Sequence, residues 1–94
     1  MHARTKRILQ ALEDNYPETL KADGFDDAIL GVAEGWFGNS HHFVICYDYG
    51  KCADILMNRD GMTPDEAWEW LDYNTTGAYV GEYTPVFLHR FRDD

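Results

Sequence analysis

Both cysteines and three of the four histidines supply the side chains that could act as nucleophiles or metal ligands. Cys46 or Cys52 with His41, His42 or His89 would provide the atoms of a thiol enzyme, in which a histidine activates a thiolate. No local signature surrounds either cysteine, and the acidic surroundings disfavour a thiolate. No C-x-x-C or H-x₃-H pair completes a four-ligand metal set. We therefore predict two free, reduced thiols, no metal and no cofactor, and keep a small thiol- or histidine-dependent enzyme, or an enzyme subunit, as an alternative.

Two glycine-containing segments are similar to ligand loops but lack the required residues. In Asn58-Arg59-Asp60-Gly61, alignment of the glycine with that of a calcium loop puts Leu56 and Ala67 where carboxylates are needed. The stretch from Gly77 to Gly81 has neither the following helix nor the lysine that a phosphate cradle needs. We interpret the first segment as the end of a helix and the second as a turn.

Carboxylates at helical spacing are the first feature that indicates binding. At about 100° per residue, Asp65, Glu69 and Asp72 share one face of a predicted helix, and Glu66 is next to them. Such a face can imitate phosphates and occupy a basic groove on a nucleic-acid-binding protein. Further acids that could extend the charge are Asp23, Asp26 and Asp27. The alternative interpretation is a solvated helix face.

Two large aromatic residues, Trp36 and Phe37, are the second such feature. They stand in a segment, Gly35–Ser40, that contains Gly35 and Gly38 and that we expect to be a loop. Aromatic side chains exposed on a loop are favoured anchors of protein interfaces. The alternative is that both rings fold back over the sheet.

The overall composition limits the partners. Seventeen acids against eight bases give the chain of 94 residues a net charge of −9. Binding to nucleic acid or to an anionic membrane depends on Lys and Arg, so neither is expected as a direct partner. A host protein with a basic surface would suit this charge. No leader peptide and no membrane-spanning run is apparent, and we predict a cytoplasmic protein.

The expected elements form one α+β domain over residues 1–94. Helices are predicted at Ala3–Asp14, at Tyr49–Asn58 after the cap Asp48, and from a capping box at Thr63 and Glu66 to a stop at Gly77; strands are predicted at Ala28–Ala33, His42–Tyr47 and Thr84–Phe91. The Gly35–Ser40 connection is predicted to be too long for a two-residue turn. The order α-β-β-α-α-β indicates a two-layer fold with a small, mainly antiparallel, three-stranded sheet.

Two packing predictions follow from this order. The second strand carries Val44 and Cys46 on one side and apolar residues on the other, so both faces of the sheet need cover. The helix pair would cover one face, and the first helix or a second copy of the chain the other, which makes a homodimer an open possibility. Asn74 should be largely buried with Ala67, Trp70 and Leu71, and should bond backbone groups near Gly77–Gly81.

The chain also resembles a family of short uncharacterised proteins of tailed bacteriophages. The matching residues are Tyr47-Asp48, Lys51-Cys52, Asp60-Gly61-Met62-Thr63, Glu66-Ala67, Asn74, Gly77-Ala78-Tyr79-Val80-Gly81-Glu82 and Thr84-Pro85-Val86-Phe87. The resemblance covers Asp27 to Leu88, about two thirds of the chain, and carries no known activity. It implies a viral setting, in which small acidic proteins often bind and block a host protein.

The leading hypothesis is accordingly a phage-type protein-binding module that inhibits or redirects a host factor, with a nuclease or defence complex as the natural class of target. Its predicted contact residues are Trp36, Phe37, Asp65, Glu66, Glu69 and Asp72. A homodimeric structural protein is a further alternative.

Overall fold

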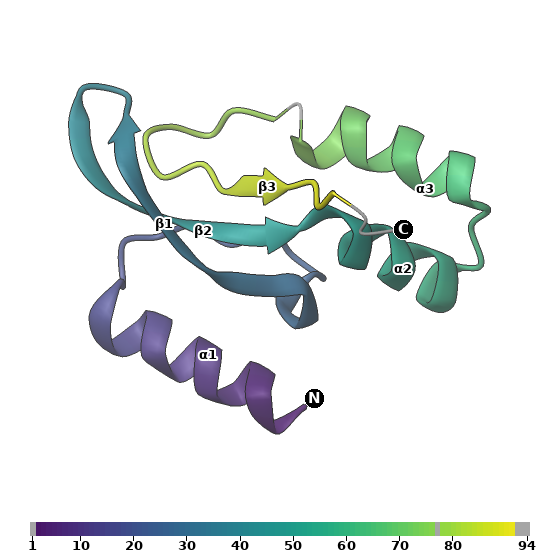
Figure 1. Cartoon of the computed structure of the whole chain (residues 1–94), viewed down its shortest axis with the longest axis horizontal. Helices are drawn as coiled ribbons and strands as arrows, with labels where there is room; N and C mark the ends of the chain where they lie inside the picture. Colours follow the sequence, from purple (N-terminus) through teal and green to yellow (C-terminus); the bar gives the residue numbers. More distant parts are fainter. Residues whose placement is uncertain (1, 77, 92–94) are drawn as a thin grey trace.

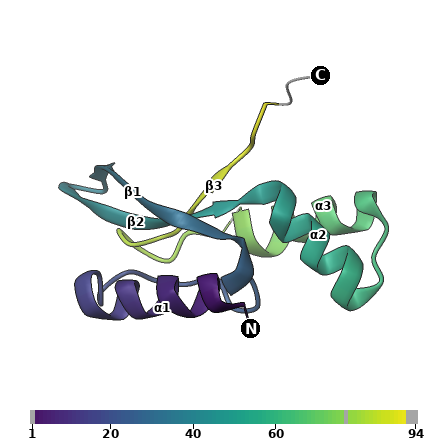
Figure 2. The same ribbon diagram turned by 60° about the horizontal axis from the view of Figure 1, so that its bottom comes forward.

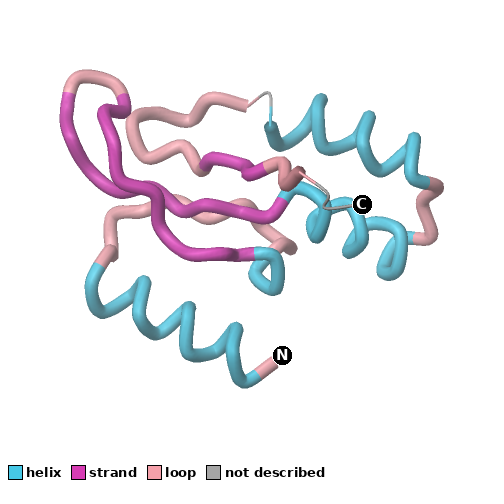
Figure 3. Tube along the Cα trace, viewed as in Figure 1, coloured by secondary structure: helices cyan, strands magenta, loops and turns pink. Residues whose placement is uncertain are grey.

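The computed structural model describes residues 2–76 and 78–91, whose arrangement is shown in Figure 1. In chain order the elements are α1 (Ala3–Asn15), η1 (Asp26–Ala28), β1 (Ile29–Phe37), β2 (Ser40–Asp48), α2 (Tyr49–Asp60), α3 (Pro64–Leu71), η2 (Asp72–Thr76) and β3 (Val86–Leu88). Here η1 is a short 3₁₀ turn and η2 a π-helical turn. Figure 3 separates the helices from the strands. The predicted α+β class and the order α-β-β-α-α-β are confirmed.

β1 and β2 form an antiparallel hairpin that is longer than predicted. Phe37 pairs with Ser40, so the connection is the two-residue turn Gly38-Asn39, and the expected longer loop is wrong. Gly38 has φ +67°, and a glycine with positive φ at the first central position is what a type II′ hairpin turn requires. Trp36 and Phe37 are strand residues, in keeping with the β preference of aromatic side chains.

β3 joins the sheet as a parallel strand. Its pairing with β2 runs from Cys46–Val86 to Asp48–Leu88, which gives the strand order β1-β2-β3. The predicted strand Thr84–Phe91 therefore contains a shorter one, and the sheet is mixed. Two helices connect β2 to β3, and a helical crossover is the usual connection between parallel strands.

α1 covers one face of the sheet, in agreement with one of the two predicted alternatives, but the helix pair does not cover the other face as predicted. In Figure 2, α1 lies beneath β1 and β2, while α2 and α3 lie beyond the end of β2. α1 covers the face that carries Ile45 and Tyr47, and the helix pair extends the same core past the end of the sheet. The buried core cluster consists of Leu12, Phe25, Ala28, Ile29, Ile45, Tyr47, Tyr49, Cys52, Ala53, Leu56, Ala67 and Leu71. Within residues 2–76 and 78–91, no helix lies over the opposite face, where Val44 is fully buried and Cys46 and Val86 are half-buried.

Both later helices begin at the predicted caps. Asp48 Oδ1 accepts the N–H of Lys51 at 3.2 Å, and α2 ends at Gly61 in the left-handed conformation, with φ +71°. At α3, Thr63 Oγ1 accepts the N–H of Glu66 at 3.3 Å while Glu66 Oε1 accepts the N–H of Thr63 at 2.8 Å. The two side chains thus satisfy two backbone donors that a helix start leaves unpaired.

Asn74 is exposed, so the prediction that it is buried is wrong. α3 ends at Leu71, and the chain continues into the π-helical turn η2, in which hydrogen bonds reach one residue further than in an α-helix. Each residue then turns through a smaller angle, which moves Asn74 off the face of Ala67 and Leu71. Its Nδ2 donates to the carbonyl oxygen of Trp70 at 3.0 Å. The predicted stop at Gly77 lies outside the described residues.

No helix in the described part of the chain is both long enough and apolar enough to span a membrane.

Removing the cap of α3 should weaken the fold. Thr63→Ala eliminates the hydroxyl that accepts the Glu66 N–H, and we expect a loss of about 1 kcal/mol in the free energy of unfolding. Urea unfolding measures the change, and Thr63→Ser, which keeps the hydroxyl, is the matched control. An unchanged midpoint for Thr63→Ala would contradict the role of the cap.

Candidate partner-binding surface

The four predicted carboxylates of α3 and η2 are all exposed, but only two are unengaged. Asp65 and Glu69 make no hydrogen bond or ion pair with any described residue. Glu66 accepts the Thr63 N–H, and this bond lowers the pKa of its carboxyl group. Asp72 Oδ1 accepts the hydroxyl hydrogen of Tyr49 at 2.8 Å. The face therefore divides into carboxylates that hold the helix and carboxylates available to a partner.

Tyr49 anchors the end of α3 from the start of α2. Its hydroxyl is held by Asp72, and burial, followed by this hydrogen bond, raises its pKa to about 12. The phenol therefore stays protonated at neutral pH and donates to the carboxylate. The contact fixes the junction of α3 and η2 against α2, and with it the position of the carboxylates on α3.

Exposed aromatic rings accompany the acids on α3. Tyr73 is 87% exposed and Trp70 is 36% exposed, although Trp70 was predicted to lie on the buried face. Together they line an open hollow of about 400 Å³. Its lining consists of Met62, Glu66, Glu69, Trp70, Tyr73 and Asn74, which we call the α3 surface. The sequence signal for it is the spacing of Glu66, Glu69, Trp70 and Tyr73 at three to four residues, which places them on neighbouring positions of a helix.

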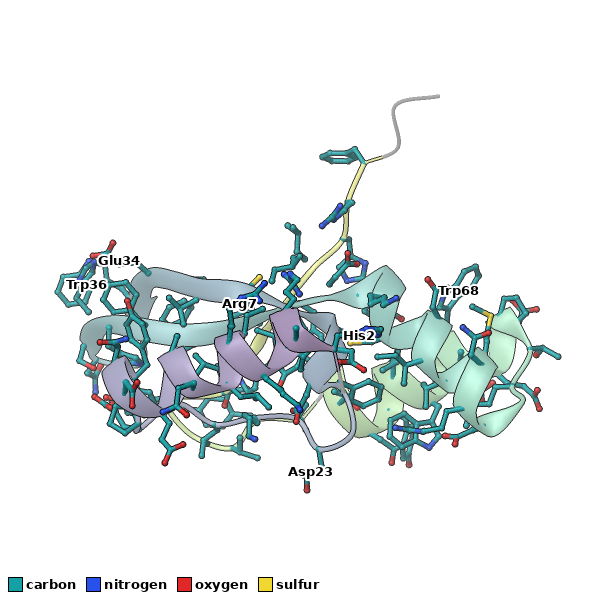
Figure 4. All side chains as sticks on the ribbon, turned by 90° about the horizontal axis from the view of Figure 1, so that it is seen from below. His2, Arg7, Asp23, Glu34, Trp36 and Trp68 are labelled. Carbon is teal, nitrogen blue, oxygen red and sulfur yellow. The ribbon has the colours of Figure 1, made fainter. Side chains whose placement is uncertain are left out.

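The aromatic pair of the hairpin does not join this surface. Trp36 is 75% exposed and its ring lies against that of His41 at 5.5 Å, whereas Phe37 is half-buried against His42 at 5.6 Å. Successive strand residues point to opposite faces, so the two rings cannot form one contact patch. Figure 4 shows Trp36 at one end of the molecule and Trp68 of α3 at the other.

The acids of the preceding segment are largely used within the fold. Asp27 Oδ1 accepts the hydroxyl hydrogen of the buried Thr5 at 2.6 Å. Asp26 lies 4.0 Å from the ammonium group of Lys21. Asp23 alone of the three has no hydrogen bond or ion pair with the described residues, and Figure 4 shows it pointing away from the body. These residues therefore add little to an acidic surface on α3.

The two thiols are poorly suited to nucleophilic chemistry. Cys52 is fully buried, and burial, with a smaller effect of Asp48, raises its pKa to about 12. Cys46 is half-buried, and the same two causes raise its pKa. Because the thiolate is the reactive form, both shifts oppose attack at neutral pH.

The histidines are engaged away from both thiols. His41 lies 3.7 Å from a carboxylate oxygen of Glu34, and the ring of His89 stacks on Tyr49 at 4.1 Å. His42 bridges Ser40 Oγ, at 2.8 Å from Nδ1, and the carbonyl oxygen of Glu82, at 2.7 Å from Nε2. Residues 2–76 and 78–91 contain no group of three His, Cys, Asp or Glu side chains arranged to hold a metal ion. His41 and His42 therefore serve contacts of the hairpin and of the segment before β3, and His89 serves a contact with α2.

Comparison with models of protein families, with curated protein sequences and with solved structures gives no significant match.

The thiols provide a test of this packing. At about pH 8, iodoacetamide should modify Cys46 more slowly than an unfolded cysteine and should leave Cys52 unmodified, because burial and a raised pKa both withhold the thiolate. Mass spectrometry measures the modification, and the protein unfolded in urea, where both thiols should react, is the control. Rapid modification of Cys52 in the folded protein, a Cys46–Cys52 disulfide or stoichiometric zinc would contradict the prediction.

Proposed function

We propose that this domain is a small acidic protein-binding module of the phage type, which inhibits or redirects a host factor by docking its α3 surface on a basic groove. The observation that carries the proposal is the meeting of an unengaged carboxylate, Glu69, with the exposed rings of Trp70 and Tyr73 around one hollow. The viral setting and the host partner rest on the resemblance over residues 27–88.

The chemistry of the α3 surface favours lysine or arginine side chains. Their aliphatic stems can lie along Trp70 and Tyr73, and their charged groups can reach Glu69 and the nearby Asp65. A cation over an aromatic face adds attraction when water is excluded. The hollow thus offers apolar contact and charge complementarity to the same basic side chain.

The net charge of −9 supports the same kind of partner. Long-range attraction increases the rate at which a basic protein meets an acidic one, while a buried aromatic anchor slows dissociation. Nucleases and defence complexes with grooves built for nucleic acid carry such basic surfaces, and a rigid helix with spaced carboxylates can occupy the groove in place of phosphates. The proposed action is therefore occlusion of the groove.

Neutralising the two unengaged acids should slow association with the partner. The partner is first captured from a bacterial lysate, and surface plasmon resonance then compares the wild type with Asp65→Asn/Glu69→Gln across a salt series. We expect a several-fold lower association rate at low salt and little difference at high salt, because salt screens the attraction.

The control for this variant is Glu13→Gln/Glu18→Gln, which removes the same charge from exposed positions in and after α1. Equal slowing by both variants would mean that only the net charge acts. An unchanged association rate and salt slope for Asp65→Asn/Glu69→Gln would make the acidic face merely a solvated one.

Aromatic substitutions distinguish the α3 surface from the tip of the hairpin. Tyr73→Ala should speed dissociation of the same complex about tenfold or more at every salt concentration, as expected of an interface anchor worth ~2 kcal/mol. Trp36→Ala, which removes a ring of similar exposure at the other end of the molecule, should change it little. The reverse result would move the anchor to Trp36 and contradict the assignment to α3.

A further inference from the structure

Behind Trp70 lies a second hollow, distinct from the α3 surface. It has a volume of about 290 Å³ and lies between the segment around Ala22 and Phe25, the end of α3 and the chain that leads into β3. Most of its lining is apolar and comes from Ala22, Phe25, Trp70, Val80, Pro85 and Phe87. Trp70 and Asn74 are shared with the α3 surface, so the two hollows are neighbours.

Three aromatic rings, those of Phe25, Trp70 and Phe87, form part of the cavity wall. The ring of Phe25 lies 6.1 Å from that of Trp70, and Phe87 is backed by the stacked ring of Tyr47 at 5.4 Å. Phe25 and Tyr47 are almost completely buried, which fixes these walls in the core. An apolar cavity of roughly 150 Å³ already suffices to bind benzene, so about 290 Å³ has room for one or two fused rings.

The lining also contains four polar residues, Lys21, Asp23, Asn74 and Thr75, of which Asp23 and Asn74 carry acceptor oxygens without a partner among the described residues. The Nδ2 of Asn74 donates to the carbonyl oxygen of Trp70, and its Oδ1 makes no hydrogen bond with any described residue. An amide oxygen with unused lone pairs is an acceptor. A ring that carries an N–H or O–H would therefore match the cavity better than a ring without a donor.

We propose that this cavity is a binding site for a flat aromatic group of one or two rings that bears a hydrogen-bond donor. The ring can come from a free small molecule or from an aromatic side chain of a protein partner. The proposal does not rest on the function proposed above: the cavity shares Trp70 and Asn74 with the α3 surface, but binding of a ring in it can be tested without any partner.

Indole is a suitable probe, with 1-methylindole as its matched analogue without the N–H. Titration into isotope-labelled protein, followed by amide and indole N–H resonances, should show saturable shifts for Ala22, Phe25 and Trp70 with a Kd on the order of 1 mM, which is typical of a fragment of this size. 1-Methylindole should bind more weakly. Absence of saturation by indole would overturn the proposal, and equal binding of the two probes would overturn the role of the donor.

Two variants and a control locate the site. Trp70→Ala removes one wall and Ala22→Phe fills the cavity, so each should weaken indole binding at least about tenfold. Trp68→Ala removes a tryptophan of the same helix that does not line the cavity and should bind as the wild type does. Cooperative urea unfolding verifies that each variant is folded. Undiminished binding in the folded Ala22→Phe variant would contradict the site.

A competition experiment distinguishes the two sources of the ring. If indole displaces a captured protein partner, the ring arrives on that partner; if indole saturates the cavity while the partner stays bound, it arrives as a free molecule. Both results presuppose saturation and support the site, whereas failure to bind indole overturns it even if the α3 surface binds a partner.

Discussion

Tyr47 joins three parts of the fold that are far apart in the sequence, one through its backbone and two through its side chain. Tyr47 lies in the central strand, where its backbone pairs with Ile29 of β1, and its ring stacks on Phe87 of β3 at 5.4 Å. Its hydroxyl oxygen accepts the N–H of Ala22 at 2.7 Å, which ties the segment after α1 to the sheet. Burial raises the pKa of Tyr47 to about 12, so the group stays neutral in the core at physiological pH.

The position of the α3 surface follows from this arrangement. β2 passes from Tyr47 directly into α2, and Cys52 and Leu56 of α2 pack with Ala67 and Leu71 of α3. Since α3 contributes only these two residues to the core cluster, most of its circumference faces outward. The cavity behind Trp70 depends on the same contacts, because Ala22 and Phe87, which Tyr47 holds, form two of its walls.

The sequence predicted best what is decided by neighbouring residues. The caps at Asp48 and at Thr63 with Glu66 involve groups three residues apart, and both are confirmed. The class and order of the elements follow from the same local patterns. The hairpin was predicted with a longer loop because Gly35 and Gly38 flank Trp36 and Phe37, and only the pairing with β2 shows that Gly35 is a strand residue.

Predictions that depended on helical phase over a longer stretch were less successful. The helical periodicity predicted that Asn74 and Trp70 share the buried face of Ala67 and Leu71. The π-helical turn after Leu71 exposes Asn74 instead, and Trp70 lies at the edge of the buried face, where it is partly exposed. The residues around Leu71 contain no sequence pattern that predicts the π-helical turn η2. For the candidate site, the four carboxylates were placed on the surface correctly. That Glu66 and Asp72 are hydrogen-bonded within the fold is visible only in the structure, where Glu66 accepts the N–H of Thr63 and Asp72 accepts the hydroxyl hydrogen of Tyr49. The distance between Trp36 and α3 is likewise a property of the folded sheet.

The central claim is that α3, with its carboxylates and rings, is the surface that meets a protein partner. Hydrogen–deuterium exchange of the complex tests it most directly, because the exchange of backbone amides reports where a partner restricts opening and access of water. The account predicts slower exchange in the bound protein at residues 62–75 and unchanged exchange at residues 35–41 of the hairpin. Protection confined to residues 35–41, with residues 62–75 exchanging as in the free protein, would contradict it.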